Sequence, residues 1–280
     1  MPFYDFDALD YISSCALKSD DEIKVAELAI ALVFDDHETV SIDRHLNHLK
    51  KISDEVGRRF CALIEAGSDD DVRARLAALK YVIIDVHDYQ PDTKNHEILE
   101  GADMIRVIDR GRGCSAALGI LYMDAAHRQG WHIEGINFPS HFLCRIEHEG
   151  VRLIFDPSSS CAVMQAHDLR SLVKNTLGDK AELSAQYLDG IDVKQSIIHL
   201  CNNIKLRRIE MGEYRNALSM VRRMLVLSPD EYRLLFDAGV LSARLSENDQ
   251  AKEYLNKYIE KAPDDYDCRD ALILLSELSD

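Results

Sequence analysis

Hydrophobic residues recur at helical spacing through most of the first 90 residues. Apolar positions repeat every three or four residues in the runs that follow Asp21, Ser41 or Asp43, and Ser68. Serine and aspartate favour the first position of a helix, because their side-chain oxygens accept from unpaired amides there. The pattern predicts three helices, and the second of them ends near Gly67.

A change of pattern begins near Asp88. The polar segment 88–101 contains Pro91 and predicts a loop, and the apolar spacing over 104–110 then predicts a short helix. The turn Gly111-Arg112-Gly113 leads into an alanine-rich run from Cys114 to about Gln129, which predicts a further helix. Gly130 is expected to end that helix in a left-handed conformation.

Two segments then alternate apolar and polar residues, which predicts two β-strands over 141–148 and 151–156. Glu149-Gly150 is a natural turn between them. If the loop is even in length and centred between residues 148 and 149, His141 lies directly opposite Asp156, with both side chains on one face. A loop of odd length would place these two side chains on opposite faces.

The last third of the chain repeats with a period of 34 residues. This spacing separates Ala217 from Ala251 and Pro229 from Pro263. A 34-residue helix-turn-helix period is typical of tetratricopeptide repeats, in which small residues let paired helices cross closely. We expect two repeats over roughly 198–231 and 232–265, followed by a capping helix to Leu278.

Composition narrows the class of protein. The chain has 280 residues, 46% of them hydrophobic, which is enough for a substantial core. Its net charge of −16, from 49 acidic and 33 basic residues, opposes binding to nucleic acid. The apolar run 29–34 is too short to span a bilayer, and the first residues lack a secretory signal. We therefore expect a cytoplasmic protein that binds neither membrane nor nucleic acid.

Seven cysteines are scattered along the chain without a CxxC pair or a Cys/His cluster at metal-ligand spacing. We expect reduced thiols, no metal site and no cofactor. One cysteine stands out, because Cys114 opens a predicted helix and is followed in the chain by His141 and Asp156. The order nucleophile, base, orienting acid makes these three residues the candidate catalytic site.

The segments around these residues carry a family resemblance. The runs Gly113 to Tyr122, Gly135 to Leu143 and Phe155 to Pro157 resemble the transglutaminase-like domain of the bacterial SirB-type family, whose members carry tetratricopeptide repeats after that domain. The resemblance implies an α+β, papain-like core. We expect a helical N-terminal part over 1–90, the core over 91–185, and the repeats with a capping helix over 186–280.

The same resemblance implies the roles of nucleophile for Cys114, base for His141 and orienting acid for Asp156. Many members of the family lack a cysteine at the position of Cys114, so this chain differs from them. A helix N-terminus and a nearby imidazolium would both lower the pKa of the thiol. The amide of Cys114 or Ser115 is a candidate oxyanion donor, and the sequence indicates no second donor.

Three hypotheses remain open at this point. In the first, the protein is an amide hydrolase or acyltransferase that works through a Cys114 thioester. In the second, it is a binding module that kept the fold, lost this activity and recruits a protein partner through the repeats. In the third, the repeats only pack on the core as a structural extension. We favour a protein-interaction or regulatory role with a candidate Cys-His-Asp site, and the enzyme is the alternative. If the site is active, Cys114 is expected to react fastest of the seven cysteines near neutral pH, and more slowly in His141→Ala.

The first repeat is rich in arginine within an acidic chain. Two repeats bury only a short core, so we expect them to lean on the preceding domain. Their basic face is expected to dock on that domain or to bind an acidic peptide, and solvated charge is the plain alternative. This face comprises Arg207, Arg208, Arg215, Arg222 and Arg223.

Overall fold

A computed structural model describes residues 6–37, 40–92, 98–262 and 265–278. Its contacts divide the chain into two compact units, which are described one at a time. One unit is residues 18–200, and the other combines residues 1–17 with residues 201–280. Among the described residues, no helix has both the length and the apolarity needed to cross a membrane.

The unit of residues 18–200 begins with helices, as the apolar spacing predicts. Asp71 caps one of them, since its carboxylate accepts from the amides of Arg73 and Ala74. The unit's first elements are η1 (Asp20–Glu22), α2 (Val25–Phe34), α3 (Ile42–Glu65), α4 (Val72–Lys80) and the π-helical turn η2 (Tyr81–Val86).

The segment that leads to Cys114 contains more structure than the loop expected from its sequence. The short strands β1 (Gln90–Pro91) and β2 (Arg112–Gly113) pair in parallel. Between them lie α5 (Ile98–Ala102) and α6 (Met104–Arg110), and the helix α7 (Ser115–His127) follows. Gly130 follows α7 with φ +71°, the left-handed conformation expected of it, and Gly111 ends α6 in the same conformation with φ +66°.

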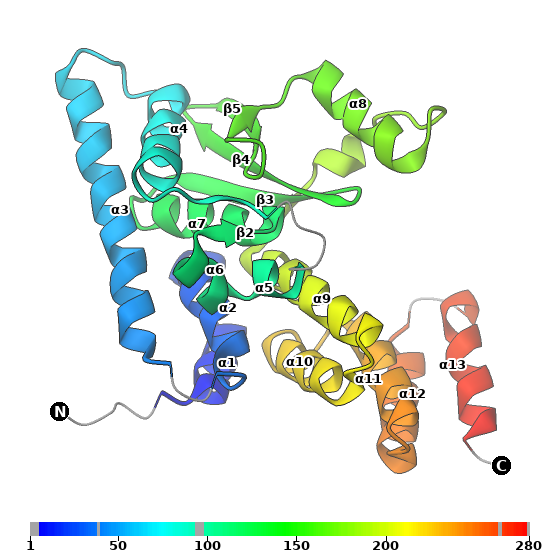
Figure 1. The fold of residues 1–280 in the computed structure, drawn as a ribbon. Helices are drawn as coiled ribbons and strands as arrows, with labels where there is room; N and C mark the ends of the chain where they lie inside the picture. Colours follow the sequence, from blue (N-terminus) through cyan, green and yellow to red (C-terminus); the bar gives the residue numbers. More distant parts are fainter. Residues whose placement is uncertain (1–5, 38–39, 93–97, 263–264, 279–280) are drawn as a thin grey trace. The chain divides into compact units, whose positions relative to one another are not determined.

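A five-stranded antiparallel sheet forms the centre of this unit (Figure 1). Its strands lie in the order β6-β5-β4-β3-β7, which makes β6 and β7 the edges. With the helices, this sheet makes the fold α+β, as expected from the sequence. The strands are β3 (His132–Phe138), β4 (His141–His148), β5 (Val151–Asp156), β6 (Ala162–Val163) and β7 (Gly190–Ile191).

The two faces of the sheet pack against different helices. On one face, α7 approaches so closely that a Cβ on Gly119 would lie 2.5 Å from Cε1 of Phe142. Tyr122 of the same helix meets Phe155 edge to face, with ring centroids 5.3 Å apart. On the other face lies α8 (Ala166–Leu177), before the short turn η3 (Ala185–Leu188). The core there comprises Ile136, Phe138, Leu143, Leu169 and Val173.

The second unit is helical and contains the expected repeats. Ala217 and Ala251 are fully buried, and a Cβ on Gly239 would lie 2.7 Å from Cγ of Leu255, so small residues permit the close helix crossings. Pro263, the second repeat proline, lies outside the described residues. The helices that form or enter this unit are α1 (Ala8–Ala16), α9 (Val193–Glu210), α10 (Tyr214–Leu227), α11 (Tyr232–Arg244), α12 (Asn248–Lys261) and α13 (Asp265–Glu277).

The arginines of the first repeat have partners within this unit. Arg215 and Arg222 both contact the carboxylate of Glu247. Arg208 and Arg223 are buried, and they donate to the carbonyl of Asn216 and the hydroxyl of Ser219. The basic surface is therefore smaller than the count of arginines predicts.

Candidate functional site

The structure brings His141 and Asp156 together. Nε2 of His141 lies 3.0 Å from Oδ2 of Asp156, and the side chains are 24% and 11% exposed. A carboxylate can only accept, so Nε2 carries the hydrogen and Nδ1 is the acceptor nitrogen of the neutral ring. This tautomer leaves Nδ1 able to take a proton from a nucleophile.

The register that produces this contact differs from the expected one. The two-residue turn Glu149-Gly150 has φ of +48° and +78°, and His148 pairs with Val151. Continued along the ladder, this register puts Asp156 opposite Leu143, two positions from His141. Both residues still share a face, because a shift of two positions preserves the alternation of side chains. The contact is therefore diagonal, and the expectation of direct opposition was wrong.

Ser158 holds Asp156 in place. Its amide and its hydroxyl both donate to Oδ1 of the carboxylate, at 2.8 and 2.7 Å. Burial raises the pKa of Asp156, but the hydrogen bonds from His141 and Ser158 outweigh it and leave that pKa below its usual value. The carboxylate is thus ionised at neutral pH and fully engaged in orienting the imidazole.

Cys114 is the N-cap residue of α7, as expected, and it is half-buried. Burial raises the pKa of its thiol; the amides of Ala117 and Ala116 offset part of this rise, and the carboxylate of Asp92 adds to it. The raised pKa keeps the thiol protonated at neutral pH, which is the less nucleophilic form.

The structure does not join Cys114 to the other two residues. No hydrogen bond links its sulfur to His141 in the described part of the chain. Strand alternation places His141 on the face of β4 that carries Leu143, whereas Phe142 points to α7. The base and the acid are therefore assembled, and the nucleophile lies outside their hydrogen-bond network.

One candidate oxyanion donor is already engaged. The amide of Cys114 donates to the carbonyl of Gly101 at 2.7 Å, so it does not point to a substrate. Of the two amides suggested by the sequence, only that of Ser115 remains a candidate. The amide of Cys114 is engaged because Gly101 belongs to the short helix α5, which is folded back onto the start of α7.

Sequence reasoning missed three residues around the site: Asp92, Gly101 and Ser158. Asp92 and Gly101 lie in the segment 88–101, which the sequence predicts to be a polar loop, and no spacing pattern connects them to Cys114. Ser158 carried a usable signal, since an aspartate followed two residues later by serine favours a local side-chain turn.

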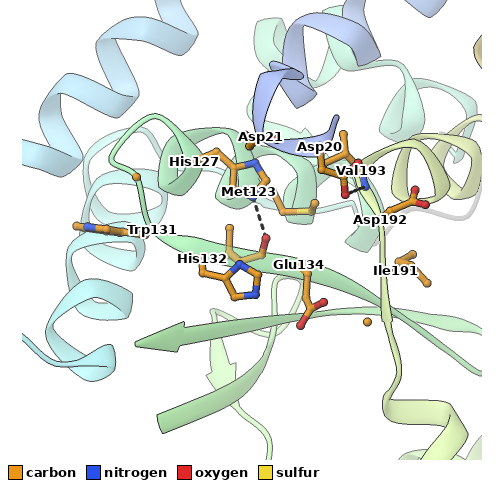
Figure 2. Close-up of a pocket in the computed structure, with 13 residues that line it drawn as sticks. Asp20, Asp21, Met123, His127, Trp131, His132, Glu134, Ile191, Asp192 and Val193 are labelled. Atoms are coloured by element: carbon orange, nitrogen blue, oxygen red, sulfur yellow. Dashed lines mark hydrogen bonds between the residues drawn. The ribbon is translucent and has the colours of Figure 1, made fainter. Parts of the chain in front are cut away.

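A separate hollow lies at the other end of α7, about 580 Å³ in volume (Figure 2). The 13 residues of α7 span roughly 18 Å, so this hollow is distinct from the site at Cys114. Three of the four carboxylates that line it already have partners: Asp20 accepts from the amide of Val193, Asp192 from that of Gln195, and Glu134 from Arg145. No cluster suited to a metal ion occurs among the described residues.

Two family models match this chain. One, for the transglutaminase-like superfamily, matches residues 43–202, which include Cys114, His141 and Asp156. The other, for the tetratricopeptide repeat, matches residues 204–275. The pair confirms the order of parts expected from the sequence.

The chain is also similar to curated bacterial proteins. It is 24% identical over 180 residues to a UPF0162 protein of Xylella fastidiosa, covering 63% of this chain and 62% of that protein. A UPF0162 protein of Vibrio cholerae is 24% identical over 70% of this chain and 72% of its own length. Protein SirB1 of Salmonella typhimurium is 25% identical over 57% of this chain and 60% of its own length.

The match thus spans less than two thirds of the first of these relatives. Among solved structures, menin is similar with a TM-score of 0.36 and 9% identity, over 97% of this chain and 69% of that one. That likeness is too weak to bear on fold or function.

Proposed function

We propose that this chain, which belongs to the transglutaminase-like superfamily, acts in a regulatory role by binding another protein. We also propose that Cys114 takes no part in catalysis. One observation carries the proposal: the thiol of Cys114 stands outside the His141–Asp156 pair, with its pKa raised by burial. A nucleophilic cysteine needs the opposite environment.

The tetratricopeptide repeats are the part that we expect to bind the partner. Repeats of this kind present extended surfaces to other proteins. A hollow of about 480 Å³ in this unit combines apolar residues with Arg222, Lys257 and Lys261. The carboxylate partners of these cations are Glu247, Glu253 and Asp230. Exposed ion pairs contribute little, about 0–1 kcal/mol each, so a partner's carboxylates can replace them.

Co-purification tests this proposal. A tagged full-length chain is expressed in the organism that encodes it, and the enriched proteins are quantified by mass spectrometry. We expect Cys114→Ala to retain the partner set and the triple variant R222A/K257A/K261A to lose it. No enrichment over the tag alone, or loss of the partners in Cys114→Ala, would contradict the proposal.

The alternative is acyl transfer, and the assembled His141–Asp156 pair favours it. In this reaction, the sulfur of Cys114 attacks an amide carbonyl while its proton passes to Nδ1 of His141. The amine leaves with that proton, and water or a second amine then breaks the thioester. Ammonia release from a glutaminyl peptide, with a mass adduct on Cys114, would establish this alternative in place of the interaction role.

We also propose a cytoplasmic location. The support is compositional, because seven unpaired cysteines are typical of a reducing compartment. A fluorescent fusion in the native organism, scored against a periplasmic and a cytoplasmic marker, tests it.

A further inference from the structure

A hollow of about 440 Å³ lies between α4 and the edge strand β6, and we call it the edge pocket. Its apolar lining includes Leu76 and Ala77 from α4 and Leu153 from β5. The neighbouring strand β5 and helix α4 are seen side by side in Figure 1. The full lining is Arg73, Leu76, Ala77, Lys80, Leu153, Cys161, Ala162, Val163 and Gln165.

Two cations stand at this pocket without acidic partners. Arg73 and Lys80 are exposed and line the same hollow from α4, and neither forms an ion pair with any described residue. By contrast, Arg75 on the same helix pairs with Asp70 at 2.9 Å. In a chain of net charge −16, two unpaired cations create a local positive rim that attracts carboxylates.

The edge strand offers an unpaired backbone donor and acceptor beside the rim. The amide of Met164 donates to the carbonyl of Ile154, which makes these two residues a hydrogen-bonded pair of the β5–β6 ladder. Hydrogen-bonded and non-hydrogen-bonded pairs alternate in an antiparallel ladder. Val163 belongs to the next pair, with Phe155, so its N–H and C=O point away from β5 to the open edge of the sheet.

We propose that the edge pocket binds an extended acidic peptide segment of a partner protein, which adds to β6 as a strand. One residue of the peptide pairs with the outward N–H and C=O of Val163, and its apolar side chain enters the hollow on the side where Val163 lines it. Carboxylates on either side of that residue contact Arg73 and Lys80.

The spacing of the cations sets the sequence pattern of the peptide. Arg73 and Lys80 are seven helix positions apart, about 10 Å along α4. In a strand, residues two positions on either side of the apolar one share its face and lie about 13 Å from each other. Long basic side chains bridge this difference, so the pattern is acidic, any, apolar, any, acidic.

The outward backbone pair favours a peptide over a small amphipathic anion. A single anion would satisfy the cations and the apolar lining, but it would leave the donor and acceptor of Val163 to water. The inference rests on the proposed interaction role and adds a second surface to it. Its failure would leave the role of the repeats untouched, because none of the edge-pocket residues belongs to them.

Fluorescence anisotropy with the full-length protein tests the inference. The probe is fluorescein-labelled glutamate-threonine-leucine-threonine-glutamate with blocked ends. We expect saturable binding that R73A/K80A weakens about tenfold or more. The double variant K50A/R58A makes the same charge change on α3, away from the pocket, and is expected to bind like the wild type.

A second variant tests strand addition itself. Val163→Pro removes an N–H that makes no bond to β5, so the ladder is expected to persist and the melting temperature to stay close to that of the wild type. We expect this variant to bind the labelled peptide about tenfold more weakly than the wild type does. Three outcomes overturn the inference: no binding, equal binding of the peptide with lysines in place of glutamates, or equal binding by R73A/K80A. Unchanged binding by a folded Val163→Pro protein also overturns it.

Discussion

His141 lies diagonally across the β4–β5 ladder from Asp156, and its Nε2 still approaches Oδ2 to 3.0 Å. The two-residue offset is within reach because diagonal neighbours on one face lie about 7–8 Å apart at Cα, and both side chains lean into the gap. Ser158 fixes the other carboxylate oxygen, so the carboxylate that contacts the imidazole is held from both sides.

Asp156→Asn is expected to destabilise the protein in a pH-dependent way. The folded-state pKa of Asp156 is lowered, so its ionised form stabilises the fold above the unfolded value of 3.8 and loses this effect as pH falls through the folded pKa. Urea unfolding is expected to show a loss of about 2 kcal/mol at pH 7 and a smaller loss at pH 3. Asp189→Asn, an exposed acid, is the control. An equal loss at both pH values would show that the charge of Asp156 contributes nothing.

Cys114 is expected to react slowly with iodoacetamide at neutral pH. Burial raises the pKa of its thiol, whereas Cys61 is exposed on α3. Mass spectrometry of alkylated peptides at pH 7.5 is expected to rank Cys61 ahead of Cys114, with no effect of His141→Ala on Cys114. The reverse ranking, together with slower labelling in His141→Ala, would favour the acyl-transfer alternative.

Gly119→Ala is expected to destabilise the sheet unit by about 1–3 kcal/mol. The added methyl group would lie 2.5 and 2.8 Å from ring atoms of Phe142, on a buried helix–sheet contact. Thermal unfolding measures the loss. The double variant Gly119→Ala, Phe142→Leu removes the clash and is expected to recover part of the stability, and a neutral Gly119→Ala would show that α7 can move away from the sheet.

Helix α1 is expected to stabilise the repeat unit, because it packs against α10. Ile12 is fully buried in that unit, and Leu9 on the same helix is 49% exposed. We expect Ile12→Ala to cost about 2–4 kcal/mol and Leu9→Ala less than about 0.5 kcal/mol, as measured by denaturant unfolding. A fragment of residues 186–280 lacks α1, so its circular dichroism is expected to melt with little cooperativity; a sharp, stable transition would mean that α1 is dispensable.

Local sequence was sufficient for most of the helices, for the β4–β5 hairpin and for the candidate residues, but not for the short elements between Asp88 and α6 or for the other strands of the sheet. Asp71 caps α4, Gly111 and Gly130 take left-handed conformations, and Glu149-Gly150 turns between two strands, all through preferences that act within a few residues. The 34-residue spacing of Ala217 and Ala251 likewise marked helix crossings, because only small side chains fit there. The parity of the β4–β5 hairpin followed from its alternation, so His141 and Asp156 could be paired in advance.

What the sequence by itself determined, then, is where most of the helices and the β4–β5 hairpin form and which residues of that hairpin share a face. Only the tertiary structure decided the register of Asp156 against β4, the engagement of the Cys114 amide by Gly101, and the environment that raises the pKa of Cys114. It also decided that α1 packs with α10, some 200 residues away in the chain. These features depend on long-range packing and on desolvation, which no local pattern of residues encodes.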